Sequence, residues 1–277
     1  VNVTTPKYFD NTGDPKPQFT GSLPTTSSGA FGSAVGSNIS SDEGMYYENI
    51  SNSNIQGLQA SDYTDSISLL ANKNAYQYNL ITIPGLVSDF ANHISSITQV
   101  INTVQTRGDS MTVIDLVRYG ANINTVTTQA TTYDTSYAAS YWPWVKTIDP
   151  DTSRQVWVPA STMIPSVYAF NDSVAEPWFA PAGINRGVMS TTIRAERNLT
   201  QGNRDTLYQN KVNGIVSFPN TGITVFGQKT LQKRKSALDR VNVRRLLIEL
   251  KSFISQVADT LVFEQNTEVT RNLFLSQ

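Results

Sequence analysis

The segment between Tyr78 and Val117 constrains the fold most, because its apolar pattern changes from strand to helix and back to strand. Residues 78–83 form a short apolar run that Pro84 and Gly85 close, and residues 111–117 form a second such run. Between the two runs, apolar residues recur at helical spacing up to Gly108: Phe90, Ile94, Ile97, Ile101 and Val104. A strand, a crossover helix and a strand form a βαβ unit, so this segment predicts a parallel sheet covered by helices.

The last third of the chain has a different order of elements. Two apolar runs, residues 212–216 and 223–226, flank a turn-forming cluster at residues 219–222, which predicts a hairpin. A long helix is expected to start near Asp239, whose carboxylate would be its N-cap. Its apolar residues recur every three or four positions: Val243, Leu246, Leu247, Leu250, Phe253, Ile254 and Val257. We expect this stripe to pack on the C-terminal domain.

These patterns predict a fold of mixed class, α/β followed by α+β. Residues 1–56 are polar and rich in loop formers, typical of the end of an upstream domain or an insertion. Residues 57–189 are expected to form a central α/β domain with a partly parallel sheet and further helices at 125–133 and 159–170. Residues 190–277 are expected to form a smaller α+β domain, with a strand at 188–194 leading into it and helices at 200–209 and after Asn266 or Thr267.

Charge and composition exclude several classes of protein. The net charge of −1 argues against a dedicated nucleic-acid binder, and the chain has no cysteine for disulfides, zinc–cysteine sites or thiol chemistry. No apolar run approaches the roughly 20 residues of a membrane span, so no membrane insertion is expected. Residues 190–277 carry 13 Lys and Arg against 7 Asp and Glu, whereas residues 1–189 carry 8 against 15. A basic C-terminal part indicates an acidic partner or a solvated helix face.

Residues that could support catalysis or ligand binding are sparse. The single histidine, His93, lies at the start of the predicted crossover helix, where a surface or half-buried imidazole is expected, and a Ser-His-Asp triad would need it as base. Tyr141, Trp142 and Trp144 suit either sugar stacking or a core, and the core is favoured. We therefore expect no catalytic residue, no cofactor-binding residue and no metal site.

Three stretches in a fixed order carry a resemblance to a known family: VWVPAS at 156–161, PWFAPAGINRG at 177–187 and VFGQKTLQKRKSALDRVNVRRLLIELKSFI at 225–254. Together they resemble the central and C-terminal domains of contractile phage tail sheath proteins, with the C-terminal arm incomplete. The resemblance implies a structural subunit of the virion tail and no enzyme. Two alternatives remain: the sheath of a bacterial contractile injection machine, such as a tailocin or a secretion system, and a hydrolase or sugar-binding surface protein.

The resemblance also implies partners and surfaces. Copies of the protein would form stacked hexameric rings around an inner tail tube protein, with baseplate and tail terminator proteins at the ends, after assembly in the host cytoplasm. Contraction would then drive the tube through the host envelope for genome ejection. A basic surface is expected to face the tube: Lys229, Lys233, Arg234, Lys235, Arg240, Arg244 and Arg245. A hairpin is expected to receive strands from the terminal arms of neighbours: Val212, Ile215, Ile223 and Val225.

Overall fold

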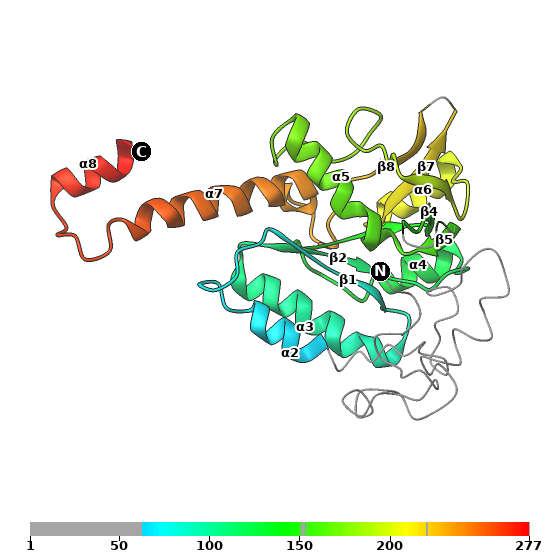
Figure 1. Cartoon of the computed structure of the whole chain (residues 1–277), viewed down its shortest axis with the longest axis horizontal. Coiled ribbons are helices and arrows are strands. Elements are labelled where there is room, and N and C mark those ends of the chain that lie inside the picture. Colours follow the sequence, from blue (N-terminus) through cyan, green and yellow to red (C-terminus); the bar gives the residue numbers. More distant parts are fainter. Residues whose placement is uncertain (1–62, 151–152, 154, 220, 277) are drawn as a thin grey trace, which may run out of the picture.

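A five-stranded sheet forms the centre of the computed structural model, which describes residues 63–150, 153, 155–219 and 221–276 (Figure 1). Its strand order is β1-β2-β3-β7-β8. The bounds are β1 (Leu80–Val87), β2 (Met111–Asp115), β3 (Ala138–Trp142), β7 (Asn213–Phe218) and β8 (Gly222–Phe226). The first four strands are mutually parallel, and β8 is antiparallel to β7. The expected partly parallel sheet is confirmed.

Helices lie on both faces of this sheet (Figure 1). They are α2 (Tyr63–Leu70), α3 (Ala91–Arg107), α4 (Ile123–Ala130), α5 (Ala160–Val174), α6 (Gln201–Gln209), α7 (Val241–Asp259) and α8 (Glu268–Ser276), with a short 3₁₀ helix η3 (Ala237–Asp239) before α7. Two separate apolar clusters fill the two faces. One contains residues from α2, α3, α4 and α6, and the other contains residues from α5 and the start of α7. Among the described residues, none of the helices has the length and apolarity needed to cross a membrane.

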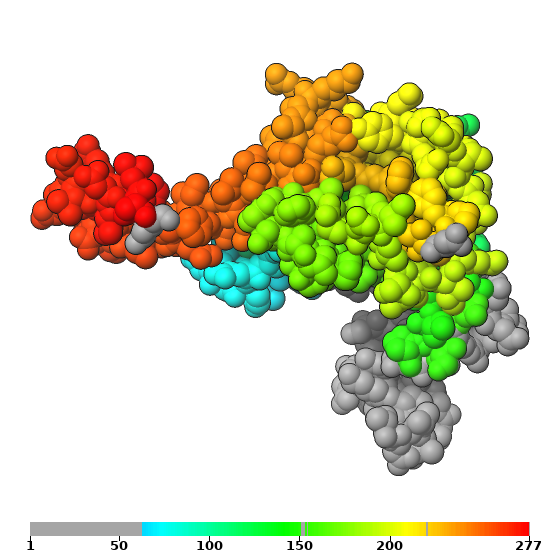
Figure 2. All heavy atoms as spheres, turned by 90° about the horizontal axis from the view of Figure 1, so that it is seen from above, coloured from blue at the N-terminus to red at the C-terminus, as the bar shows by residue number. Residues whose placement is uncertain are grey.

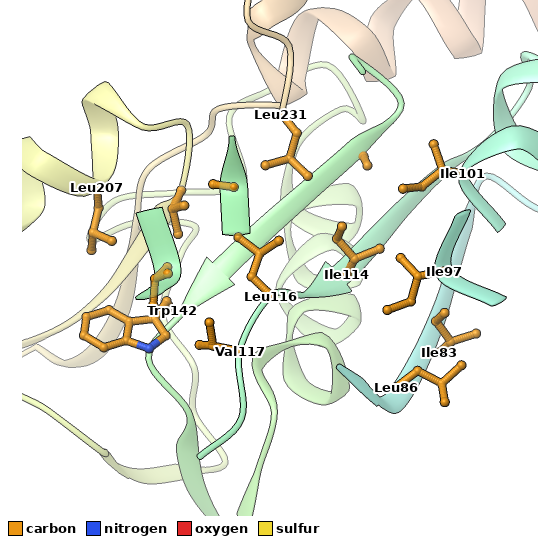
Figure 3. Close-up of a cluster of buried hydrophobic side chains, with 14 of the residues drawn as sticks. Ile83, Leu86, Ile97, Ile101, Ile114, Leu116, Val117, Trp142, Leu207 and Leu231 are labelled. Carbon is orange, nitrogen blue, oxygen red and sulfur yellow. The ribbon is translucent and has the colours of Figure 1, made fainter. Parts of the chain in front are cut away.

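The first of these clusters closes the βαβ unit (Figure 3). Ile97 and Ile101 from α3 lie against Ile83 of β1 and Ile114 of β2, and all four are buried. Apolar area removed from water stabilises the fold by roughly 25 cal/mol per Å². Burial of Ile97 and Ile101, which are four positions apart on one face of α3, therefore holds the helix against the sheet. Helix α3 ends where the sequence predicts, because Gly108 adopts φ 66° and its N–H donates to the carbonyl of Val104.

The first strand differs from the expectation in one respect. The sequence suggests that Pro84 and Gly85 end it, yet β1 continues through both residues to Val87, with a register irregularity between Thr82 and Val87. Because β1 lies at the edge of the sheet, the missing N–H of Pro84 removes no central ladder bond. Gly85 adopts a φ of 94° at the irregularity, a conformation that glycine reaches without steric cost.

A second, three-stranded sheet has the order β5-β4-β6 and consists of β4 (Val145–Ile148), β5 (Gln155–Val158) and β6 (Thr192–Ala195). The strand expected at 188–194 thus begins only at Thr192. Tyr141 and Trp142 at the end of β3, and Trp144 just before β4, are 3–4% exposed, which confirms the core interpretation of these aromatic residues. The hairpin is also confirmed, since β7 pairs with β8 from Gly214–Phe226 to Phe218–Gly222.

The central sheet contains strands from both sides of the boundary expected at residues 189–190. β7 follows that boundary in the sequence, yet it pairs in parallel with β3, which precedes it. The central sheet is therefore continuous across the expected boundary between residues 57–189 and 190–277. The division into these two domains stays a prediction. The expected polar segment 1–56 lies outside the described residues.

Candidate assembly interface

The segment that leads from β8 into α7 is fixed by a buried ion pair. The ammonium Nζ of Lys229 lies 2.5 Å from Oδ2 of Asp239, and both side chains are less than 10% exposed. The backbone of Lys229 pairs with Arg240, and its N–H donates to Oδ1 of Asn213 at 2.5 Å. The Asp239 carboxylate is therefore occupied by Lys229 and, at 3.2 Å, by Arg240.

This pairing corrects the expected start of the long helix. Arg240 is the N-cap residue of α7, with no side-chain capping bond, and Asp239 belongs to the preceding turn of 3₁₀ helix. The side-chain oxygen of a cap has to accept hydrogen bonds from amides in the first turn. Asp239 does not do so because its oxygens contact two cations. The sequence places Asp239 near the start of a helix, but it does not show that Lys229 pairs with this carboxylate.

Two arginines of α7 point into the body of the protein. Arg245 pairs with Asp172 of α5 at 2.5 Å and lies over the ring of Tyr168. Arg244 lies 4.0 Å from the ring centroid of Tyr137 and donates to the hydroxyl of Ser136, and burial lowers its pKa. Glu249 lies four positions after Arg245 on the helix, yet the ion-pair partner of Arg245 is Asp172 of α5.

The apolar stripe of α7 consequently faces away from the body. The buried residues of the helix are Val241, Arg244, Arg245 and Ile248. On the opposite face, the stripe residues with the greatest exposure are Leu247, Leu250, Phe253 and Ile254, at 41–53%. The ion pair and the arginine contacts hold the other face of α7 against the sheet and α5, so among the described residues the stripe lies on the side away from them. That the stripe packs on the C-terminal domain stays a prediction.

Helix α8 continues this exposed apolar surface. α7 projects from the body, and α8 lies beyond its end, away from both sheets (Figures 1 and 2). None of the described residues of α8 is buried, and Val269 and Leu275 are 78% and 79% exposed. The expected helix after Asn266 or Thr267 is present, and the hydroxyl of Thr267 accepts from the N–H of Thr270. We define the projection as α7 from Leu246 onward together with α8.

The predicted basic surface is divided by the fold. Lys229, Arg244 and Arg245 are buried and engaged within the chain, and Arg240 is half-buried beside Asp239. Lys233, Arg234 and Lys235 are exposed in the loop before η3. These three are brought together on one loop, whereas Arg245 contacts α5 and Arg244 contacts Ser136 and Tyr137, just before β3. That the exposed loop faces an inner tube stays a prediction.

The predicted strand-receiving hairpin has little free edge. Val212, Ile215, Ile223 and Val225 are all buried. On the outer side of β8, the N–H of Val225 donates to the carbonyl of Gly187 at 2.8 Å, and Gly183 and Met189 donate to β8 carbonyls. A Cβ on Gly187 would lie 2.7 Å from the carbonyl oxygen of Val225, so only glycine permits this approach. A strand from a neighbour would have to displace residues 183–189.

The residues weighed for catalysis have structural roles. His93, expected at the surface or half-buried, is 2% exposed, and its Nδ1 accepts the N–H of Val87 at 3.0 Å. Burial lowers the pKa of this imidazole.

A buried carboxyl that sequence reasoning missed joins the sheet to α5. Asp115, at the end of β2, accepts bonds from the N–H and the hydroxyl of Ser161 at the start of α5, and burial raises its pKa to about 7. No spacing in the sequence indicates this pair, because the two residues lie 46 positions apart.

Taken together, the described residues form an α/β body from which α7 and α8 project with an exposed apolar face (Figure 1). Exposed apolar surface of this extent marks protein–protein contact. Comparison with known families identifies the protein further. Residues 56–231 match the family of the phage tail sheath protein central domain, so the chain belongs to the phage tail sheath family, whose members are structural proteins. The resemblance found in the sequence is thereby confirmed.

Relatives and solved structures agree with this assignment. The chain is 39% identical over 156 residues to the tail sheath protein of Vibrio phage KVP40, and 36% identical over 121 residues to that of Enterobacteria phage T4. These matches cover 56% and 44% of the chain but only 22% and 18% of the relatives. The chain thus spans about a fifth of the length of those proteins.

The solved structures show the same fold at lower identity. A chain in the anti-feeding prophage baseplate is 21% identical with a TM-score of 0.59, over 78% of this chain and 55% of that one. A chain of the PVC extracellular contractile injection system, from its sheath complex in the contracted state, is 24% identical with a TM-score of 0.57, over 74% and 55% of the two chains. The mixed α/β fold is therefore that of sheath subunits.

Proposed function

We propose that this chain is part of a subunit of a contractile phage tail sheath, which polymerises around an inner tube. The observation that carries the proposal is the match of residues 56–231 to the phage tail sheath protein central domain, together with relatives of 36–39% identity that are tail sheath proteins. Leu247, Leu250, Phe253 and Ile254 contact water in the single chain, and burial of such side chains is worth about 1.5–3 kcal/mol each. Contact with another surface in the assembled whole protein would supply that burial.

The finer parts of this proposal follow from the family. Copies form stacked, six-membered rings in a helical sheath, with the inner tube protein inside and the baseplate and tail terminator proteins at the ends. Assembly takes place in the host cytoplasm, and the finished sheath is part of the virion tail. Contraction is a change between two packings of the same subunits, so the energy is held in subunit contacts and no cofactor is required.

A bacterial injection machine is the second candidate, because the solved structures with the same fold belong to such systems. Those similarities lie below 25% identity and concern the fold. The relatives with 36–39% identity are phage proteins, which favours the phage tail. The genes beside that of the full-length protein provide the discriminating observation, since capsid and terminase genes accompany a phage tail.

Negative-stain microscopy of the full-length protein tests the proposed function. We expect hollow, striated tubes, and we expect Leu250→Glu with Phe253→Glu to prevent them while leaving the unfolding transition of the subunit unchanged. Thr98→Glu, an exposed position on α3, is the matched control and should leave the tubes intact. Dispersed monomers from the unmodified protein under all assembly conditions would contradict the proposal.

A further inference from the structure

The junction between β1 and α3 is held by an imidazole that accepts a backbone hydrogen bond. His93 is 2% exposed, and its Nδ1 accepts the N–H of Val87, the last residue of β1, at 3.0 Å. The next amide, that of Ser88, donates to the carbonyl of Asp115 at 2.9 Å. Because β1 lies at the edge of the sheet, with its register irregularity before Val87, these two bonds fix the end of the strand.

Three features of the site favour the neutral form of His93. A protonated imidazole donates from both nitrogens, so it has no lone pair for the N–H of Val87. Burial also lowers the pKa of the ring. His93 is the third residue of α3, and the partial positive charge at the start of a helix disfavours a further positive charge there. The neutral ring and the bond to Val87 therefore exist together.

The other side chains around the junction do not offset this preference. The ring of Phe90 packs edge-on against the imidazole, with the two centroids 5.3 Å apart. The remaining titratable groups have partners of their own: Asp89 with Arg118 at 3.2 Å, Asp115 with Ser161, and Tyr133 with Ser88 at 2.5 Å. In the described part of the chain, neither of these carboxylates pairs with His93. A proton on the buried ring would thus lack a counter-ion.

The junction also joins the two sheets. Val87 and Phe90 share a buried apolar cluster with Trp144 and Trp157, against which Tyr119 packs. Trp144 precedes β4 and Trp157 belongs to β5, so this cluster connects the end of β1 to the three-stranded sheet. Charged residues border it: Lys146 and Arg194 lie over the ring of Trp157, and the N–H of Glu196 donates to the carbonyl of Trp144. A change at Val87 and Phe90 would therefore reach the second sheet.

We propose that His93 is an acid-sensitive latch between the two sheets. Protonation drives the imidazole out of its buried position, frees the amide of Val87 and loosens the cluster that Val87 and Phe90 form with the two tryptophans. The latch is closed above the ordinary histidine pKa of about 6.5 and opens as the pH falls below it, because the opened state binds the proton more tightly. This inference concerns the single subunit and goes beyond its proposed assembly.

Hydrogen exchange of backbone amides, measured by mass spectrometry on the full-length protein and corrected for the intrinsic rate at each pH, tests the latch locally. A local measurement is needed because Asp115 changes the stability of the whole chain in the opposite direction. We expect the protection of residues 86–93 to fall about tenfold between about pH 7.5 and about pH 5, since the ratio of protonated to neutral imidazole changes tenfold per pH unit.

Two variants assign this response to a residue. His93→Asn keeps an acceptor oxygen near the place of Nδ1 but does not titrate, so its protection should stay constant. Asp115→Asn is the matched control and should keep the acid response. Exchange of the imidazole Cε1–H, also followed by mass spectrometry, measures the pKa of His93 without a substitution and so decides the question even if His93→Asn does not fold.

We expect that measured pKa to lie below the ordinary value of 6.5. A value at or above 6.5 would overturn the inference, as would equal acid responses of the unmodified protein and His93→Asn. So would unchanged protection of residues 86–93 in the unmodified protein, or a response that is lost in Asp115→Asn but kept in His93→Asn.

Discussion

Lys229 and Asp239 form a buried ion pair, with Nζ and Oδ2 2.5 Å apart, at the point where the hairpin leads into α7. Lys229 also forms an isolated β-bridge with Arg240, the residue that follows Asp239. The pair therefore sets the direction in which α7 leaves the body. It connects the sheet, whose last strand ends at Phe226, to the projection that we propose as an assembly surface.

Removal of one partner of this pair should destabilise the chain. We expect Asp239→Ala to lower the free energy of unfolding by about 3–5 kcal/mol, because it leaves the Lys229 ammonium buried without its counter-ion. Urea unfolding followed by circular dichroism measures the change. The double variant Lys229→Met, Asp239→Leu is the control and should be closer to the unmodified chain. A loss below about 1 kcal/mol for Asp239→Ala would show that water reaches the lysine.

Truncation of two adjacent residues of α7 should lower the free energy of unfolding by different amounts. Ile248 is 4% exposed and Leu247 is 41% exposed. We expect Ile248→Ala to cost about 2–5 kcal/mol of stability in the single chain, whereas Leu247→Ala should cost less than about 1 kcal/mol. Denaturant unfolding of both variants provides the comparison. A larger loss for Leu247→Ala than for Ile248→Ala would mean that the stripe of α7 packs on its own chain.

The buried Asp115 carboxyl should make stability depend on pH. Burial raises its folded pKa from 3.8 to about 7, so the folded state binds a proton that the unfolded state releases between those values. Its contribution to stability is full below the unfolded pKa and is lost as the pH rises through about 7, a change on the order of 4 kcal/mol.

Asp115→Asn isolates this effect from other titrating groups such as His93. The amide keeps hydrogen bonds to Ser161 without a charge, so we expect the variant to gain stability over the unmodified chain as the pH rises from about 4 to about 8. Urea unfolding at several pH values gives the difference curve. A flat difference would mean that Asp115 is ionised throughout.

The exposed loop offers a test of tube contact that is separate from folding. Lys233→Glu with Arg234→Glu should weaken co-sedimentation of the sheath protein with tubes of its partner at low salt, and the difference should shrink as salt screens the charges. Lys251→Glu, at an exposed position on α7, is the control for a change of charge elsewhere on the surface. Unchanged co-sedimentation of the folded loop variant would remove this loop from the tube-facing surface.

Much of the fold could be predicted from local pattern. The βαβ unit, the hairpin at 212–226, the helix end at Gly108 and the helix after Thr267 depend on neighbours in sequence, and all four are present. Apolar spacing and turn residues act over a few positions, so they are visible before the chain folds. The sparse catalytic residues likewise favoured a structural protein, and the three family stretches identified which kind.

Tertiary structure decided which face of α7 is buried. The periodicity of the sequence predicts an apolar stripe but does not show what the stripe contacts. Arginine side chains are mostly exposed to solvent, so the pattern does not predict that Arg244 and Arg245 are buried. Asp172 and Ser136, 73 and 108 positions before their arginine partners, turn Arg245 and Arg244 inward. Lys229, ten positions before Asp239, pairs with its carboxylate in place of the helix cap, and residues 183–189 cover the edge of β8. Sequence determined the elements and their family, whereas contacts between distant residues determined which surfaces remain free for assembly.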